Sequence, residues 1–238
     1  MSGPVFKFCT FIFILLLLTG CSKQGVPSEP NPTDMPPSTH LRYLALGDSY
    51  TIGESVAAHE RFPYLTAGLL RTNGLSVDDP VYIARTGWTT ANLLAAIEAA
   101  NLDAPFDVVT LLIGVNDQYQ GLDTAGYRMR FTQLLQKAVA LAGNRRDRVF
   151  VLSIPDYSAT PFVNEGNKAR VGREIDEFNV INKEVTLSYS ISYTDITPST
   201  REAATDLSLL ANDGLHYSAK AHGQWAELVA PAIIEALK

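Results

Sequence analysis

The chain has few of the residues that cross-link small folds or bind metal ions. Its 238 residues include only two cysteines and four histidines. Because Cys9 and Cys21 both lie near the N-terminus, the rest of the chain can form neither a disulfide framework nor a cysteine metal site. No His-Glu-x-x-His run occurs either. We therefore expect no metal ion and no other cofactor.

Positive charge is also scarce. Lys and Arg number 19 against 25 Asp and Glu, which gives a formal net charge of −6. The adjacent pair Arg145-Arg146 is no more than a solvated loop would carry, so we expect no nucleic-acid partner. No internal repeat is visible, and we expect a monomer.

One apolar run, from Phe8 to Leu18, follows the positive charge of Lys7. It is shorter than the about 20 residues that span a bilayer, but it suits a signal-peptide core. Its end, Leu18-Thr19-Gly20-Cys21, resembles the bacterial lipobox, in which the cysteine is lipidated and becomes the mature N-terminus. An ordinary signal peptide or a signal anchor is the alternative. We expect residues 1–20 to be a lipoprotein signal peptide and Cys21 to be the lipidation site.

The same resemblance predicts where the protein resides. Ser22 after the lipidated cysteine favours the outer membrane, with the folded domain in the periplasm or at the cell surface. Residues 21–40 are expected to be a lipidated tether, because small polar residues and five prolines leave almost nothing to bury. Residues 41–238 then have the size of one domain with a single core.

Within residues 41–238, strand-like and helix-like segments alternate. Short apolar runs predict strands at 43–46, 77–84, 108–113, 149–154 and 191–195. Helical spacing predicts helices at 63–72, 89–100, 123–142 and 219–237, the last with a kink or break at Pro231. Near-continuous apolar strands suit a parallel sheet covered on both faces. The pattern predicts a three-layer α/β/α sandwich around a five-stranded parallel sheet.

Four polar segments stand where these strands end or where a helix begins: Gly47-Asp48-Ser49, Arg85 to Thr90, Gly114-Val115-Asn116-Asp117 and Asp213-Gly214-Leu215-His216. Ligands bind at the carboxyl ends of strands in open α/β sheets, so the four segments predict one shared site.

The residue types in these segments fit nucleophilic catalysis. A serine hydroxyl is a poor nucleophile until a neighbouring base removes its proton, and His216 is the natural base for Ser49. Asp213 precedes His216 by three residues and could accept the other ring N–H. Asp48 and Asp117 are expected to stabilise the turns in which they lie. The remaining histidines have no such partner nearby and are expected at the surface: His40, His59 and His222.

In this order, the motifs resemble those of the SGNH hydrolases, also called the GDSL esterase/lipase family. Gly47-Asp48-Ser49 matches the nucleophile block, Gly87 the glycine block, Gly114-x-Asn116-Asp117 the asparagine block and Asp213-x-x-His216 the terminal block. Tyr50 stands where the family usually has leucine, which could reshape the pocket wall. The Gly-x-Ser-x-Gly elbow of the α/β hydrolases is absent.

This resemblance implies a flavodoxin-like sheet with strand order 2-1-3-4-5. It also implies a catalytic set of Ser49, Asp213 and His216. The implied oxyanion hole consists of the backbone N–H groups of Ser49 and Gly87 and the side-chain amide of Asn116. A glycine at position 87 permits close backbone approach.

The expected reaction is hydrolysis of an acyl ester through an acyl-serine intermediate. We expect a short- or medium-chain carboxylester or a lysophospholipid as substrate. An acyl thioester and an O-acetylated envelope glycan remain open, as does a non-catalytic binding lipoprotein. Aromatic residues near the strand exits predict an aromatic-lined cleft, and residues 155–168 could form a lid or a pocket wall. The aromatic residues are Tyr50, Trp88, Tyr119, Tyr157 and Phe162.

Overall fold

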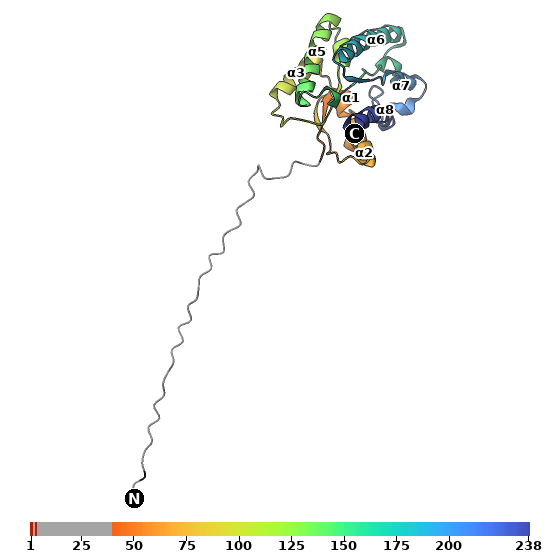
Figure 1. Cartoon of the computed structure of the whole chain (residues 1–238). Coiled ribbons are helices and arrows are strands. Elements are labelled where there is room, and N and C mark those ends of the chain that lie inside the picture. Colours follow the sequence, from red (N-terminus) through yellow and green to blue (C-terminus); the bar gives the residue numbers. More distant parts are fainter. Residues whose placement is uncertain (2, 4–39) are drawn as a thin grey trace. The chain divides into compact units, whose positions relative to one another are not determined.

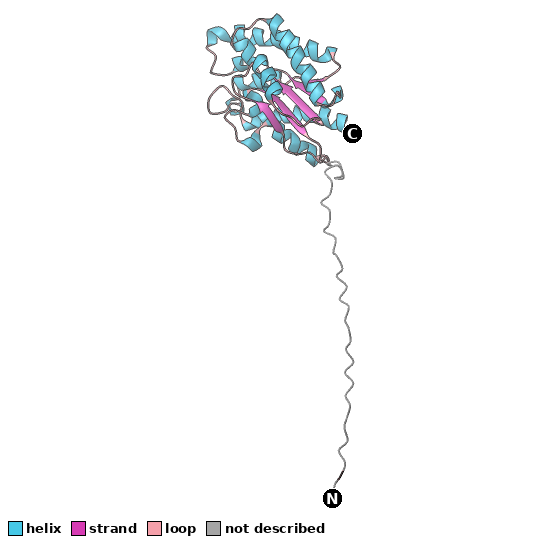
Figure 2. Ribbon diagram, turned by 90° about the vertical axis from the view of Figure 1, so that its left-hand side faces the viewer, coloured by secondary structure: helices cyan, strands magenta, loops and turns pink. Residues whose placement is uncertain are grey.

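A five-stranded parallel sheet forms the centre of the computed structural model, which describes residues 1, 3 and 40–238 (Figures 1 and 2). All of the predicted signal peptide except residues 1 and 3 lies outside the described residues, as do Cys21 and all of the predicted tether except His40. The strands are β1 (Tyr43–Gly47), β2 (Val81–Ala84), β3 (Val108–Leu112), β4 (Val149–Leu152) and β5 (Ser192–Thr194). Their order, β2-β1-β3-β4-β5, confirms the predicted architecture.

The register of the sheet fixes the place where its strands exit. Gly47, the last residue of β1, pairs with Ala84 of β2 on one side and with Leu112 of β3 on the other. The chain therefore passes from β1 to β2 on one side of β1. It then returns to the other side of β1, where β3, β4 and β5 follow in order. Such a switch point is where open α/β sheets bind ligands.

The central strands are more buried than the edge strands. Every residue of β1, β3 and β4 is buried, whereas β2 and β5 are partly exposed. Both edge strands are shorter than predicted. Asp78-Asp79-Pro80 interrupts the segment before β2, and proline has no N–H for the ladder. Val77 forms only an isolated bridge with Leu41.

Helices cover both faces of the sheet (Figure 2). Helix α2 packs on α8, whereas α5 packs on both α3 and α6. The α-helices are α1 (Ser49–Ile52), α2 (Phe62–Thr72), α3 (Thr90–Ala99), α4 (Val115–Tyr119), α5 (Thr124–Leu141), α6 (Glu165–Ser188), α7 (Thr197–Arg201) and α8 (Ala219–Leu237). Short 3₁₀ turns are η2 (Ala58–Glu60), η3 (Arg146–Arg148), η4 (Tyr157–Ala159), η5 (Glu202–Ala204) and η6 (Leu207–Leu209).

Helix α8 continues through Pro231, so the helix has no break at the position where the sequence predicts a kink or break. None of the helices in the described part of the chain has the length and apolar character needed to cross a membrane.

Helix α6 is the longest of the helices that the sequence analysis missed. Its buried residues recur at helical spacing at Val171, Ile175, Phe178 and Val185. Charged residues between them dilute the apolar signal, and the predicted loop at 155–168 overlaps the start of the helix. The periodicity alone could have identified it.

Candidate active site

The exit of β1 presents Ser49 at the start of α1. Gly47 must be glycine, because a Cβ there would overlap the Thr51 hydroxyl and the Leu112 carbonyl oxygen. The Asp48 carboxylate then accepts a hydrogen bond of 3.0 Å from the Tyr50 N–H and caps the helix. At the other end, Gly53 adopts a left-handed φ of 63° and its N–H bonds to the Ser49 carbonyl. This short, capped helix fixes the backbone of Ser49.

Asp48 stabilises its turn, as the sequence predicts, but its environment is unusual. The side chain is fully buried, and its Oδ2 has no hydrogen-bond partner among the described residues. Burial raises the pKa of Asp48 to about 8, and the nearby Asp117 carboxylate adds to that rise, while the Tyr50 amide opposes it. The carboxyl group therefore holds its proton at neutral pH.

The turn before α8 carries the histidine–aspartate pair. His216 Nδ1 lies 2.6 Å from Asp213 Oδ2, and Asp213 Oδ1 accepts the backbone N–H groups of Leu215 and His216 at 3.0 and 2.9 Å. Gly214 has a φ of 67° in this tight turn. Because Nδ1 faces the carboxylate, Nε2 is the ring nitrogen that remains for a reacting group.

Ser55, which the sequence analysis did not single out, also binds Asp213. Its hydroxyl donates a hydrogen bond of 2.7 Å to Oδ2, the same oxygen that faces the His216 ring. Partial burial alone would raise the pKa of Asp213. Hydrogen bonds from Ser55, the His216 ring and the two backbone amides outweigh burial and hold that pKa well below its usual range.

Ser55 lies just after α1, so this hydrogen bond joins the nucleophile segment to the base loop across 158 residues of sequence. No local motif marks the residue. The only unusual feature is its left-handed φ of 68°, which a sequence does not reveal.

The exit of β3 brings in Asn116. Gly114 precedes it with a φ of 130°, and a Cβ there would overlap the Tyr127 and Ile154 side chains. The Asn116 side-chain nitrogen donates a hydrogen bond of 3.0 Å to the Trp88 carbonyl. A primary amide has two N–H donors, so this bond orients the group and leaves the second hydrogen available.

Asp117 ties the loop after β2 to α4, as the sequence predicts for a turn residue. The buried carboxylate accepts the N–H of Thr90 at 2.8 Å and its hydroxyl at 2.6 Å. Arg130 lies 3.2 Å from the same carboxylate. The segment that contains Gly87 and Trp88 is thereby held against the segment that contains Asn116.

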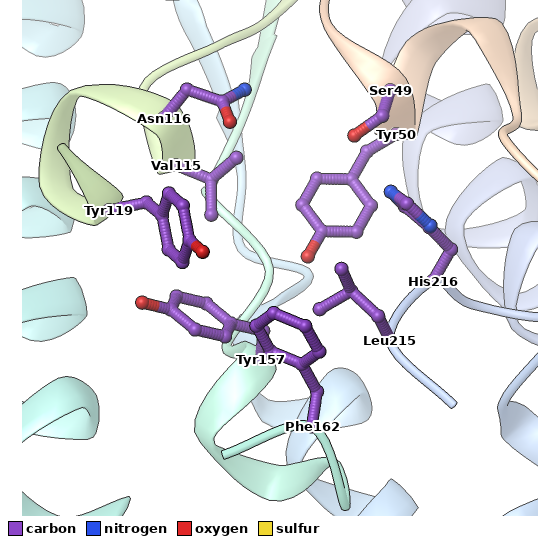
Figure 3. Close-up of a pocket in the computed structure, with 9 residues that line it drawn as sticks. All are labelled: Ser49, Tyr50, Val115, Asn116, Tyr119, Tyr157, Phe162, Leu215 and His216. Atoms are coloured by element: carbon purple, nitrogen blue, oxygen red, sulfur yellow. The ribbon is translucent and has the colours of Figure 1, made fainter. Parts of the chain in front are cut away.

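One pocket brings three of the five predicted catalytic and oxyanion residues together. It has a volume of ≈ 160 Å³ and contains Ser49, Asn116 and His216 in its lining. Figure 3 shows Ser49 and His216 on one side of the pocket, with Asn116 across from Ser49. The described residues show no hydrogen bond between the Ser49 hydroxyl and His216. Such contacts are often looser before substrate binds.

Four of the five aromatic residues that the sequence analysis singled out lie in the pocket lining. Tyr50, Tyr119, Tyr157 and Phe162 line the pocket, together with Val115 and Leu215. The Tyr50 ring meets the His216 ring edge-on, with 5.7 Å between centroids. From the segment 155–168, Tyr157 and Phe162 form part of the wall, while Glu165 already begins α6.

Three predicted residues, Gly87, Trp88 and Asp213, lie outside the pocket lining. Gly87 is exposed, with a φ of 82°, and a Cβ added at this position would have nothing within 4 Å. The Trp88 side chain is partly buried and packs against the core. Its backbone carbonyl, rather than its ring, contributes to the site by accepting a hydrogen bond from the Asn116 amide. Asp213 contacts Nδ1 of His216, on the side of the ring opposite Nε2.

The prediction that His222 lies at the surface is wrong. Its side chain is buried on the inner face of α8, where Nδ1 accepts the Phe62 N–H at 3.2 Å and the ring stacks on Phe62. Burial, with smaller effects of His216 and Arg61, lowers the pKa of His222 to about 3, so the ring is neutral. His59 and His40 are exposed, but His40 lies 3.0 Å from Asp78, a partner that the sequence analysis did not foresee.

A serine, a histidine–aspartate pair and an oriented amide at the carboxyl edge of a parallel sheet are the parts of a serine hydrolase site. The sequence model of the GDSL-like lipase/acylhydrolase family matches residues 45–224, and the chain belongs to this family. No curated protein matches the chain in a sequence comparison.

Several solved structures share the fold. TesA is 20% identical with a TM-score of 0.65, covering 82% of this chain and 99% of TesA. The esterase EstA from Pseudoalteromonas sp. is 16% identical with a TM-score of 0.62, covering 82% and 98%. A variant of the acetyl xylan esterase Axe2 from Geobacillus stearothermophilus is 19% identical with a TM-score of 0.59, covering 81% and 94%. At these identities, the likeness shows the fold alone.

Proposed function

We propose that the protein hydrolyses carboxylic esters of short acyl chains through an acyl-serine intermediate. Ser49 is the nucleophile, His216 the general base and Asp213 the group that orients it. The observation that carries the proposal is the Asp213–His216 contact of 2.6 Å beside a pocket that also contains Ser49 and Asn116.

In the proposed reaction, His216 first accepts a proton from Ser49 and then donates it to the departing alcohol. As the Ser49 oxygen attacks the ester carbonyl carbon, its proton passes to Nε2 of His216. The imidazolium then gives this proton to the departing alcohol oxygen as the C–O bond breaks. Water attacks the acyl-serine with the same proton transfers, which releases the acid and restores Ser49. Asp213 stabilises the transient imidazolium and keeps Nε2 directed at the pocket.

The developing oxyanion needs donors that are already in place. The N–H of Ser49 lies in the first turn of α1, where a helix offers it no backbone acceptor. The free hydrogen of the Asn116 amide and the N–H of Gly87 complete the proposed set. Loss of one such donor typically lowers the rate on the order of 10²–10³-fold.

The size of the pocket favours short acyl groups. Its volume of ≈ 160 Å³ is close to that of an engineered cavity of about 150 Å³ that holds benzene. An acyl chain of up to about six carbons therefore fits, whereas a long-chain fatty acyl group would extend beyond the pocket. This argument favours a short-chain ester over a lysophospholipid.

A series of p-nitrophenyl esters from acetate to laurate tests both parts of the proposal. We expect kcat/KM to fall beyond about six carbons. Ser49→Ala and His216→Ala should each lower kcat by at least about 10³-fold, and Asp213→Ala should have a smaller effect. Ser188→Ala on α6 is a matched serine control. Wild-type protein that hydrolyses no ester would instead indicate a non-catalytic binding lipoprotein.

We also propose that the protein is a lipoprotein anchored through Cys21. Support comes from the sequence Leu18-Thr19-Gly20-Cys21 after a short apolar core. Stable anchoring needs more than one acyl chain, which lipidation at such a cysteine supplies. Cys21→Ser should move the protein from the membrane fraction to the soluble fraction and abolish incorporation of a fatty-acid label. Labelling that persists in the variant would contradict the proposal.

A further inference from the structure

The pocket that contains Ser49 borders a second, larger depression, here called the outer groove. It has a volume of ≈ 400 Å³, and its lining includes Gln118, Asp123, Arg170, Glu174 and Glu177. Tyr119 and Tyr157 line both the pocket and the outer groove. A single ester molecule could thus place its acyl group in the pocket and its alcohol part in the groove.

We propose that the outer groove binds the alcohol part of the ester, and that this alcohol is a neutral, hydroxyl-rich molecule such as a sugar. The inference rests on the proposed ester hydrolysis and adds a substrate class to it.

A line of fixed polar groups runs from the shared wall into the groove. The Tyr157 hydroxyl donates to Gln118 Oε1 at 2.9 Å, and Gln118 Nε2 donates to Glu174 Oε2 at 2.6 Å. Arg170 then donates to both Glu174 oxygens at 2.8 and 3.0 Å. Interlocked side chains of this kind present donors and acceptors in set positions, which suits recognition of several hydroxyl groups at once.

The charge of the groove argues against anionic alcohols. Three carboxylates, those of Asp123, Glu174 and Glu177, accompany the single guanidinium of Arg170, which is already paired with Glu174. A phosphate-bearing alcohol, such as a lysophospholipid headgroup, would face net repulsion there. Neutral hydroxyl groups can bond to carboxylates without that cost.

Two exposed aromatic rings stand at the mouth of the pocket. Tyr119 is 59% exposed and Phe162 is 48% exposed, with their ring centroids 6.4 Å apart. Figure 3 shows both rings on the side of the pocket away from Ser49. Large exposed aromatic rings beside a cavity often mark ligand contacts. The apolar C–H face of a sugar ring can lie against them while its hydroxyl groups reach the polar groove.

Acetyl esters that differ only in their alcohol part test the inference on the full-length protein. The substrates are 6-O-acetylglucose, ethyl acetate, acetylcholine and an acetyl ester of glycerol phosphate. We expect kcat/KM for 6-O-acetylglucose to exceed that for ethyl acetate by about 100-fold, a difference of about 2.7 kcal/mol. The anionic ester should lie well below the sugar ester, because the groove carries a net negative charge.

Single substitutions then test whether the preference for the sugar ester arises in the outer groove. Tyr119→Ala and Arg170→Ala should each lower the ratio of sugar-ester to ethyl-acetate kcat/KM by about tenfold, mainly through KM. Glu98→Gln, an exposed carboxylate on α3, should leave both activities unchanged.

Several outcomes would overturn the inference. The proposed binding of the alcohol part in the outer groove would be wrong if kcat/KM were equal for the sugar ester and ethyl acetate. It would also be wrong if the ratio were insensitive to both variants. Ester hydrolysis itself would stand in either case. A preference for acetylcholine or the phosphate ester would overturn the sugar class. Absence of hydrolysis with every ester would overturn the proposed function itself.

Discussion

Asp213 accepts four hydrogen bonds, and three of them come from its own turn. These three are the N–H groups of Leu215 and His216 and the contact with the His216 ring, and they are set by the local sequence. The fourth comes from Ser55, in the segment after the nucleophile. Ser55 thus acts on the reaction through Asp213, as a positioning residue.

Replacement of Ser55 tests this role. Ser55→Ala should lower kcat by about 3- to 10-fold with little change in KM, because a hydrogen bond to a charged, partly exposed group is lost. Ser55→Gly removes the same hydroxyl but relaxes the left-handed backbone. A shared loss of kcat in both variants identifies the hydroxyl as the cause.

A double-mutant cycle provides the stricter control. In an Asp213→Asn background, Ser55→Ala should have almost no further effect on kcat, because its partner is already altered. Fully multiplicative losses would show that Ser55 does not act through Asp213.

Asp48 permits a prediction about pH and stability. Its folded-state pKa of about 8 lies above the value near 3.9 expected in the unfolded chain. Between these values the folded protein binds more protons than the unfolded chain, so the group's contribution to stability decreases as pH rises. Asp48→Asn removes this titration while retaining an acceptor for the Tyr50 N–H.

The free energy of unfolding of Asp48→Asn, relative to wild type, should therefore increase from about pH 4 to about pH 8 and level off above. The slope cannot exceed about 1.4 kcal/mol per pH unit for one proton. Chemical denaturation at a series of pH values measures it. A difference that does not change with pH would mean that Asp48 titrates normally.

The elements around the site are packed so closely that strand exits tolerate little change. At the end of β1, Gly47 lies against Thr51 of α1 and Leu112 of β3. Gly114 at the end of β3 is equally confined by Tyr127 and Ile154. These glycines set the distance between the helices that carry Ser49 and Asn116.

Gly47→Ala should therefore destabilise the protein by about 1–3 kcal/mol or more, because a methyl group there overlaps its neighbours. The matched control is Gly68→Ala in α2, where a Cβ would have nothing within 4 Å. That change should be neutral or stabilising by up to about 1 kcal/mol, since glycine weakens helix interiors. Equal stability of the two variants would contradict the packing argument.

Across the whole molecule, the sequence predicts the layers and the buried strands, since apolar runs and helical periodicity are local signals. Strand ends are less predictable, because Asp78-Asp79-Pro80 shortens β2 within an otherwise apolar stretch. The order of the strands follows from the family resemblance rather than from periodicity. Helix α6 was missed because many charged residues dilute its apolar signal, although its buried residues recur at regular helical spacing.

The candidate site shows the same division between local and long-range information. Motifs near strand ends predict that Ser49, Asn116 and His216 meet, since parallel strands bring their exits to one edge. Ser55 and the buried His222 could not be placed in this way. Each depends on a contact with a residue about 160 positions away, with Asp213 and Phe62 respectively.

The central claim is that the Ser49 hydroxyl is activated within this pocket, and covalent labelling tests it most directly. A fluorophosphonate probe followed by peptide mass spectrometry should modify Ser49 alone, with no labelling of Ser49→Ala and labelling slowed by at least about 10³-fold in His216→Ala. Folded wild-type protein that stays unlabelled at Ser49, or hydrolysis that survives in Ser49→Ala, would contradict the claim.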